Sequence, residues 1–203
     1  MTFQPAGNYY DKYNTHNPVA RALMDGFMKS FDELVELSGA PATSFEVGCG
    51  EGELSIRLAR CGMRAVGMDI AAEAIDEARK RIQAAGVNVP VSVGSIYELD
   101  AAANRSDLVV CCEVLEHLED VEAAIDVLHA LTGKRLIASV PREPIWRAMN
   151  MVRGKYWTDL GNTPGHVQHW STARFLDVLR RRFNVVEFRT PLPWTMALCA
   201  PKR

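Results

Sequence analysis

The sequence predicts an α/β protein built on a doubly wound, mostly parallel sheet. From residue 43 onward, short apolar runs alternate with helical patterns, which is typical of a parallel sheet covered on both faces. A glycine-rich turn follows the first of these runs. The last two apolar runs are joined by a short turn with two prolines and are expected to form an antiparallel hairpin.

Length and composition favour one compact domain spanning residues 1–203. The chain is 48% hydrophobic and 24% charged, as in average globular proteins. Its net charge of −2 argues against a nucleic-acid binder, which needs a basic surface. The five cysteines form no C-x-x-C pair, which favours a reducing cytoplasm. We expect no secretory leader and no integral membrane association, because the longest uncharged stretch, 190–201, is too short for a span.

The first element is a long helix. Asn17 is a good N-cap before Pro18 at the first helical position, and Gly39 stands where a C-cap is expected. Apolar residues recur between them at steps of three and four, so one face must pack on the core. We interpret residues 1–40 as an N-terminal lid followed by this helix.

The sheet and its crossover helices follow in alternation. The predicted parallel strands are 44–47, 65–68, 89–93, 108–111 and 136–140, and the predicted helices between them are 53–60, 72–85 and 121–131. A further helix is expected at 173–182, followed by hairpin strands at 184–189 and 194–200. The connection 141–172 is too long for an ordinary loop and is expected to form an acceptor-side loop or lid.

The first strand ends in a turn with glycines at alternate positions, Gly48, Gly50 and Gly52. Glycines there permit a sharp turn and a close approach of the backbone to a ligand. Asp69 follows Gly52 by 17 residues, at the end of the second predicted strand. An acid at that point can accept hydrogen bonds from both ribose hydroxyls, so the sequence predicts an adenosine ligand.

The spacing of this turn resembles motif I of the class I S-adenosylmethionine-dependent methyltransferases. Glu46 precedes the glycines, and the third glycine comes one residue too early for the dinucleotide pattern G-x-G-x-x-G. The resemblance covers nearly the whole chain and implies a Rossmann-like, seven-stranded sheet with an antiparallel C-terminal hairpin. It also implies S-adenosylmethionine as the cofactor.

The same resemblance assigns further cofactor contacts. Ser95 and Ile96 fall where the family contacts the adenine, and Cys112 and Glu113 fall where it lines the methionine part. The complete predicted cofactor set is Glu46, Gly48, Cys49, Gly50, Gly52, Asp69, Ile70, Ser95, Ile96, Cys112 and Glu113.

The stretch E-V-L-E-H at 113–117 resembles the O-methyltransferases of ubiquinone biosynthesis and, more distantly, the small-RNA 2′-O-methyltransferases. In the RNA enzymes, two glutamates and two histidines hold a divalent metal at the acceptor hydroxyl. The matching positions are Glu113, Glu116, His117 and His166. These ligand types suit magnesium, manganese or zinc, and the first three would share a face if the turn were helical.

Without a metal, a histidine can act as general base, because it titrates near neutral pH. The candidate catalytic residues are His117, which we rank first, Glu113, His166 and His169. Each of them also has a purely structural interpretation.

The predicted activity is methyl transfer to a small-molecule acceptor, most plausibly a hydroxyl oxygen. The apolar and basic segment 144–157 could cover an apolar or aromatic acceptor, touch a lipid surface, or simply pack on the core. The alternatives are a nicotinamide-dependent oxidoreductase and a non-catalytic subunit that binds S-adenosylmethionine. The sequence does not predict the oligomeric state.

Overall fold

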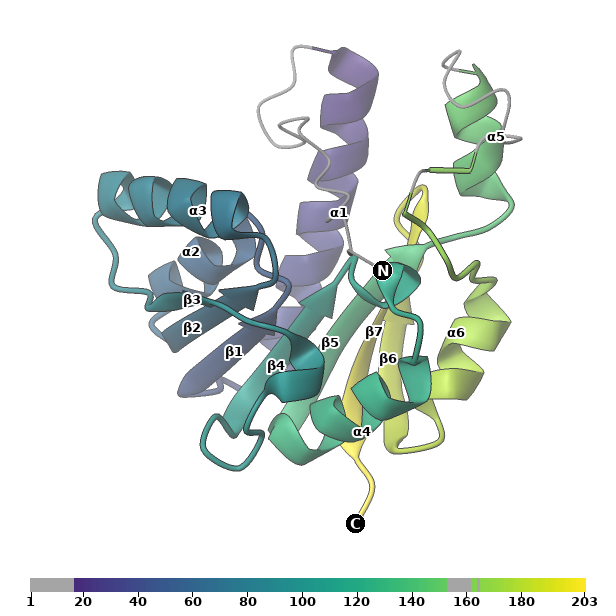
Figure 1. The fold of residues 1–203 in the computed structure, drawn as a ribbon. Helices are drawn as coiled ribbons and strands as arrows, with labels where there is room; N and C mark the ends of the chain where they lie inside the picture. The colour runs from purple at the N-terminus through teal and green to yellow at the C-terminus, as the bar shows by residue number, and fades with distance from the viewer. Residues whose placement is uncertain (1–16, 153–161, 164) are drawn as a thin grey trace.

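The computed structural model describes residues 17–152, 162–163 and 165–203. It contains a seven-stranded sheet with the order β3-β2-β1-β4-β5-β7-β6 (Figure 1). The strands are β1 (Thr43–Val47), β2 (Arg64–Asp69), β3 (Val91–Val93), β4 (Ser106–Cys112), β5 (Thr132–Pro141), β6 (Phe183–Arg189) and β7 (Trp194–Pro201). The first five pair in parallel, and β7 runs antiparallel between β5 and β6. The predicted fold class is therefore confirmed.

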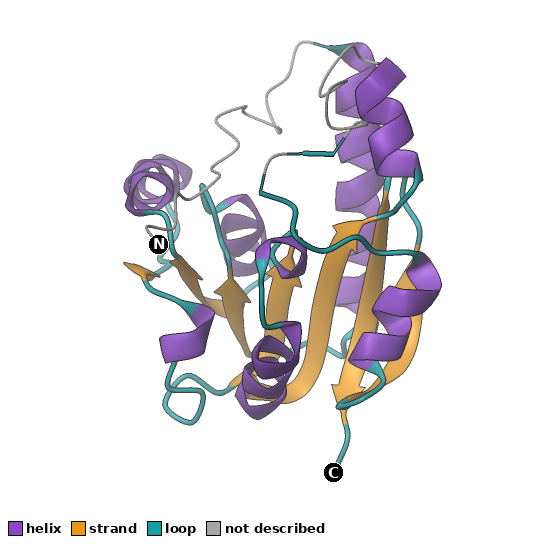
Figure 2. Cartoon of the chain, turned by 45° about the vertical axis from the view of Figure 1, so that its right-hand side comes forward, coloured by secondary structure: helices purple, strands orange, loops and turns teal. Residues whose placement is uncertain are grey.

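Helices cover both faces of the sheet (Figure 2). The helices are α1 (Pro18–Leu37), α2 (Glu53–Arg60), α3 (Ala72–Ala85), α4 (Val121–Leu131), α5 (Ile145–Val152) and α6 (Thr172–Leu179), with short 3-10 turns η1 (Ile96–Glu98) and η2 (Leu115–His117). Side chains of α1, α2 and α3 share one hydrophobic cluster, and those of α4 and α6 share the other. Within the described ranges, no helix has the length and apolar content to span a membrane.

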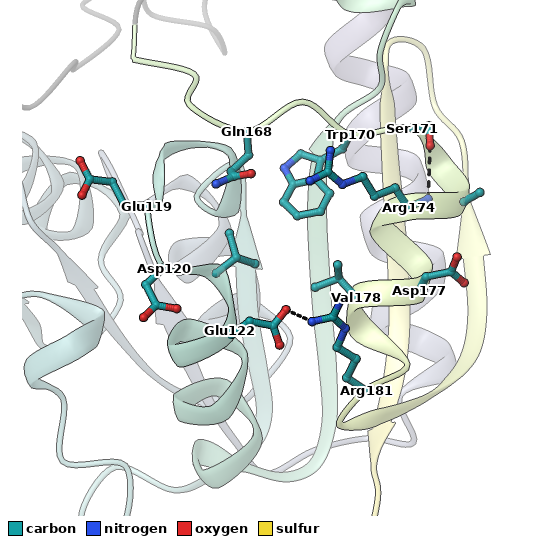
Figure 3. A pocket seen from close by; sticks show the side chains of 12 residues that line it. Glu119, Asp120, Glu122, Gln168, Trp170, Ser171, Arg174, Asp177, Val178 and Arg181 are labelled. Atoms are coloured by element: carbon teal, nitrogen blue, oxygen red, sulfur yellow. Dashed lines mark hydrogen bonds and ion pairs between the residues drawn. The ribbon is translucent and has the colours of Figure 1, made fainter.

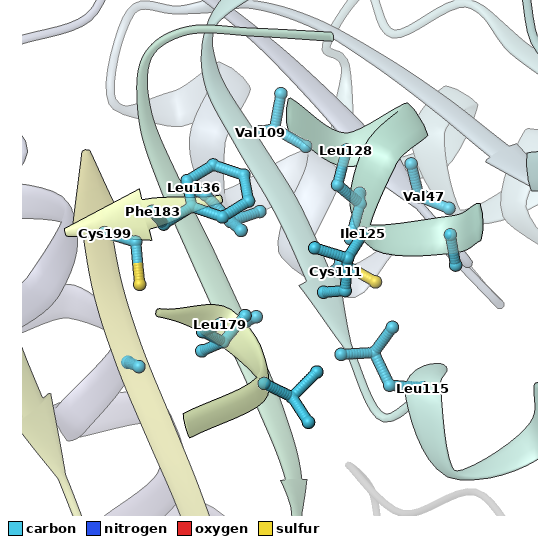
Figure 4. Packing of buried hydrophobic residues seen from close by; sticks show 14 of the residues in the cluster. Val47, Val109, Cys111, Leu115, Ile125, Leu128, Leu136, Leu179, Phe183 and Cys199 are labelled. Carbon is cyan, nitrogen blue, oxygen red and sulfur yellow. The ribbon is translucent and has the colours of Figure 1, made fainter. Parts of the chain in front are cut away.

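Strand β4 shows how the sheet separates the two cores. Val109 and Cys111 belong to the cluster under α4 and α6 (Figure 4), whereas Leu108, Val110 and Cys112 belong to the cluster under α1 and α2. Successive side chains of a strand point to opposite faces. A strand buried on both faces therefore has a continuous apolar sequence rather than an alternating one.

The long first helix forms as predicted. The Asn17 side chain accepts hydrogen bonds from the backbone N–H groups of Val19 and Ala20, and Pro18 occupies the first helical position. Phe27 and Phe31 are buried against the sheet. Residues 1–16, which include the predicted lid, lie outside the described residues.

Several predicted boundaries differ from the structure. Strand β5 begins at Thr132, four residues before the prediction, because the chain passes from α4 directly into the strand and the Thr132 hydroxyl donates to Leu128 O. Helix α6 ends at Leu179, and the expected last residues 180–182 form a turn. Strand β3 begins at Val91 rather than at residue 89.

The long connection after β5 contains the helix α5, which the sequence indicated within 144–157. Residues 153–161 and 164 of the predicted lid 141–172 are not among those the structure describes.

The glycine turn is tightly packed at its first position. Gly48 has a φ of +74°, and a Cβ there would lie 2.2 Å from Val114 Cγ2. Gly86 has a similar φ of +66° with nothing within 4 Å of such a Cβ. We expect Gly86→Ala to cost ~1 kcal/mol of unfolding free energy from backbone strain alone. Gly48→Ala should cost a further ~1–3 kcal/mol, because the added methyl overpacks the site.

Equilibrium urea unfolding of the two variants measures this difference. If both variants lose the same unfolding free energy, the space beside Val114 does not restrict the size of the side chain at position 48.

Candidate functional site

The glycine turn between β1 and α2 is held by the end of β2. The backbone N–H groups of Gly48 and Cys49 both donate to Met68 O, at 2.7 and 3.0 Å. Gly52 N–H donates to Cys49 O at 2.9 Å. Gly48, Gly50 and Gly52 have φ values of +74°, +51° and +84°, so glycine is required for this path of the backbone.

Asp69 lies beside this turn, as predicted. Its Oδ2 accepts a hydrogen bond from Gly50 N–H at 2.8 Å, and its Oδ1 accepts one from Ala71 N–H at 2.9 Å. Each carboxylate oxygen has a second lone pair. The side chain is therefore held in place by the backbone while it can still accept hydrogen bonds from two hydroxyl groups.

The turn does not have the character of a phosphate site. The N–H groups of Gly48, Cys49, Gly50 and Gly52 already donate to acceptors within the protein. A phosphate-binding loop needs N–H groups directed at the ligand. Glu51 at the turn is ion-paired with Arg81, and Asp69 accepts a hydrogen bond from the turn. The occupied N–H groups therefore favour a nucleoside without phosphates over a pyrophosphate.

Glu46 lies beneath the turn and is only 3% exposed. It accepts a hydrogen bond from the Ser55 hydroxyl, which ties β1 to α2. Burial raises the pKa of Glu46 to about 8, although the Ser55 hydrogen bond opposes the shift. In the ligand-free protein, Glu46 therefore supports the turn in a largely protonated state near neutral pH.

The other predicted cofactor contacts differ in exposure. Ile70 is 51% exposed next to Asp69, whereas Ile96 is 6% exposed and packs in the core. The exposed apolar side chain next to Asp69 is thus that of Ile70, and the adenine contacts of Ile70 and Ile96 both stay predictions. Ser95 accepts a hydrogen bond from Tyr97 N–H and caps η1.

Cys49 and Cys112 are buried at the ends of β1 and β4. Desolvation raises the pKa of both thiols well above the ordinary value. Neither thiol therefore has the character of a nucleophile.

A second group of side chains lies on and beside η2. Ligand atoms of Glu116, His117 and His166 all lie within 4.8 Å of one another. The rings of His117 and His166 meet edge to face with centroids 4.9 Å apart. His117 Nδ1 lies 2.9 Å from Gly165 O. A carbonyl oxygen only accepts, so this contact places a proton on Nδ1 and fixes the orientation of the ring.

Backbone hydrogen bonds bring His166 to this place. Val167 N–H and Gln168 N–H both donate to Glu116 O, at 2.9 and 3.1 Å. The Gln168 amide donates to Leu118 O at 3.2 Å. Three residues of the predicted metal set, Glu116, His117 and His166, therefore lie close together. His169 is not part of this group, and its Nε2 lies 2.9 Å from Asn162 Oδ1.

Glu113 is separate from this cluster, contrary to the predicted four-residue set. Its carboxylate accepts hydrogen bonds from Ser139 Oγ at 3.1 Å and from Trp194 Nε1 at 2.6 Å. The expected shared face assumed a helix from residue 113, but the 3-10 turn begins only at Leu115, and Glu113 has a φ of +60°. The backbone therefore turns Glu113 toward β5 and β7.

Three aromatic side chains form a row of ring contacts that begins at His166. Trp146 of α5 stacks on His166 with a centroid distance of 5.9 Å and an interplanar angle of 25°. Trp194 of β7 lies 6.0 Å from Trp146, and Phe27 of α1 lies 5.1 Å from Trp194. These residues come from distant parts of the sequence, and no local motif identifies them.

A separate cavity of about 570 Å³ lies between α4 and α6 (Figure 3). Its described lining comes from 119–122 and 168–181 and includes the ion pair of Glu122 with Arg181. The glycine turn does not contribute to this lining. This cavity is therefore distinct from the predicted cofactor site.

Comparison with known proteins identifies a domain family. Residues 45–134 match the family described as Methyltransferase domain. The ubiquinone biosynthesis O-methyltransferase of Xanthomonas euvesicatoria pv. vesicatoria is 32% identical over 155 residues, which is 74% of this chain and 64% of that protein. The enzyme of the same name from a Methylobacterium species is 41% identical over 86 residues, which is 42% of this chain and 34% of that protein. The chain thus spans less than two thirds of these relatives.

Solved structures share the whole fold at lower identity. The magnesium protoporphyrin IX methyltransferase of Synechocystis, solved with bound S-adenosylhomocysteine, superposes with a TM-score of 0.72 at 22% identity. The alignment covers 94% of this chain and 90% of the Synechocystis chain. The N-methyltransferase NodS of Bradyrhizobium japonicum gives a TM-score of 0.66 at 22% identity, with 93% and 90% covered. These comparisons confirm the predicted family resemblance and fold.

The buried carboxyl of Glu46 makes stability depend on pH. Its pKa of about 8 in the folded protein exceeds the ordinary value of 4.5, so the folded state binds more protons between these limits. Stability should fall as pH rises through this range, by as much as ~1.4 kcal/mol per pH unit from this group. Glu46→Gln, which carries no charge, should remove that part of the slope.

Urea unfolding of both proteins at several values between pH 5 and pH 8 measures this effect. Parallel curves for the wild-type protein and the variant would contradict the assigned protonation of Glu46.

Proposed function

We propose that the chain is a class I methyltransferase that transfers the methyl group of S-adenosylmethionine to an oxygen atom of a small molecule, because residues 45–134 match the Methyltransferase domain family and the fold agrees. The observation that carries the proposal is the glycine turn beside Asp69. The N–H groups of Gly48, Cys49, Gly50 and Gly52 are satisfied within the protein, which suits a nucleoside without phosphates.

The residues of the cofactor side have distinct roles in this proposal. Asp69 accepts hydrogen bonds from the ribose hydroxyls, and Ile70 provides an apolar surface for the adenine. Bound S-adenosylmethionine supplies an electrophilic methyl group on a sulfonium. The turn residues Gly48 and Gly50 allow the backbone to approach the ligand closely.

His117 is the proposed general base on the acceptor side. Its Nδ1 lies 2.9 Å from Gly165 O, which fixes the direction of the ring, and a neutral imidazole can accept a proton from an acceptor hydroxyl. His166 packs against this ring and shields it from water. We assign His169 to a supporting contact with Asn162.

A divalent metal is an optional part of the proposal. One carboxylate and two imidazoles, from Glu116, His117 and His166, have the donor chemistry for a zinc- or manganese-like ion. Such an ion would lower the pKa of an acceptor hydroxyl.

The acceptor that these surroundings favour is a flat, partly apolar molecule with a hydroxyl group. Trp146 provides aromatic surface next to His166, and the buried rings of Trp194 and Phe27 pack behind it. Relatives named ubiquinone biosynthesis O-methyltransferase also support an oxygen as the acceptor atom.

The Asp69 assignment predicts a loss of cofactor affinity. Asp69→Asn should weaken binding of S-adenosylhomocysteine at least tenfold, because a charged hydrogen-bond acceptor is lost. Isothermal titration calorimetry measures the change. The matched control is Asp107→Asn, whose carboxylate accepts from Ala42 N–H near the start of β4 and should not affect binding. Tight binding of NAD in place of the S-adenosyl ligand would instead identify an oxidoreductase.

The His117 assignment predicts a loss of turnover without a loss of cofactor binding. His117→Asn should lower kcat for methylation of a catechol by about 10²-fold or more. His129→Asn is the control, because that ring contacts Lys202 O at the far end of α4. Equal kcat values for the wild-type protein and His117→Asn would refute the base. Cofactor binding without turnover on any hydroxyl acceptor would indicate a non-catalytic subunit.

A further inference from the structure

Glu113 lies in the sequence between the glycine turn, where we propose that the cofactor binds, and the cluster of Glu116, His117 and His166, where we propose that the acceptor binds. It directly follows β4, and its N–H donates to Ser139 O at 3.1 Å. The next residue, Val114, packs on Gly48 of the glycine turn. The carboxyl group of Glu113 is therefore tied to the turn by its own backbone.

Two donors fix the direction of this carboxyl group. Ser139 Oγ donates to Oε1 and Trp194 Nε1 donates to Oε2, so each oxygen accepts from a different strand. An indole N–H and a serine hydroxyl both donate in these contacts, so both carboxyl oxygens accept. Together the two donors orient the carboxyl group between β5 and β7.

Trp194 is well placed to act as a fixed donor. It is 6% exposed, and β7 pairs it with Pro141 of β5. Phe27 packs edge-on against the Trp194 ring with centroids 5.1 Å apart, and the centroid of Trp146 lies 6.0 Å from that of Trp194. The Trp194 ring thus packs against two other aromatic rings, and its N–H cannot turn away from Glu113 without disturbing these contacts.

We propose that Trp194 is a positioning residue that holds the Glu113 carboxylate for the ammonium group of the amino-acid part of S-adenosylmethionine. The inference rests on the proposed function, since it names the group that Glu113 meets. A cation in this position needs an ionised partner, and Glu46 beneath the turn is bonded to Ser55 instead.

A double-mutant cycle tests whether Trp194 acts through Glu113. Trp194→Phe removes the N–H and should weaken binding of S-adenosylhomocysteine to the full chain about tenfold. Glu113→Ala should weaken it by a similar or larger factor. The double variant should bind no more than about twofold weaker than Glu113→Ala alone, because the two residues form one interaction.

The matched control is Trp170→Phe. Trp170 is 2% exposed, and its indole nitrogen has no hydrogen-bond partner among the residues the structure describes. This variant loses an equally buried indole and should bind the ligand like the wild-type protein. In turnover, Trp194→Phe should raise the KM for S-adenosylmethionine and leave kcat nearly unchanged at saturation.

The outcomes separate the inference from the proposed function. If the wild-type protein does not bind S-adenosylhomocysteine, the proposed function itself fails. If the wild-type protein binds and Trp194→Phe binds equally well, or if the losses in the two single variants add, the positioning role is refuted. Should Trp194→Phe fail to fold, benzothienylalanine at position 194 removes the N–H and keeps the ring shape, with the same expected results.

Discussion

The left-handed backbone of the glycine turn is the constraint on which the rest of the site depends. Because Gly48 and Cys49 both donate to Met68 O, the turn is joined to the end of β2, and Asp69 is the next residue along that strand. Gly50 then donates to Asp69 itself. The same turn leaves room for Val114, so the segment after β4 also takes its position from the turn.

Local signals were sufficient to predict much of this architecture. Helices α2, α3 and α4 begin and end at the predicted residues, because Gly52, Gly86 and Asp120 mark their ends with left-handed backbone or a side-chain cap. The glycine turn and Asp69 were also predicted from spacing alone. The single-domain organisation and the cytoplasmic location stay predictions.

The remainder of the site depends on tertiary contacts that spacing does not encode. Glu113 is directed by Trp194, which is 81 residues away in the sequence, and so the E-V-L-E-H stretch divides into two parts. Glu113 joins the cofactor side, whereas Glu116 and His117 join His166 on the acceptor side. In the proposed function, Glu113 meets the methyl donor and His117 meets the acceptor hydroxyl.

A crystal structure with S-adenosylhomocysteine tests the central claim most directly. We expect the ribose hydroxyls within hydrogen-bond distance of Asp69, the adenine against Ile70, and the amino-acid end of the ligand beside Glu113. A ligand bound in the cavity between α4 and α6, or one that leaves Asp69 and the glycine turn untouched, would contradict this account.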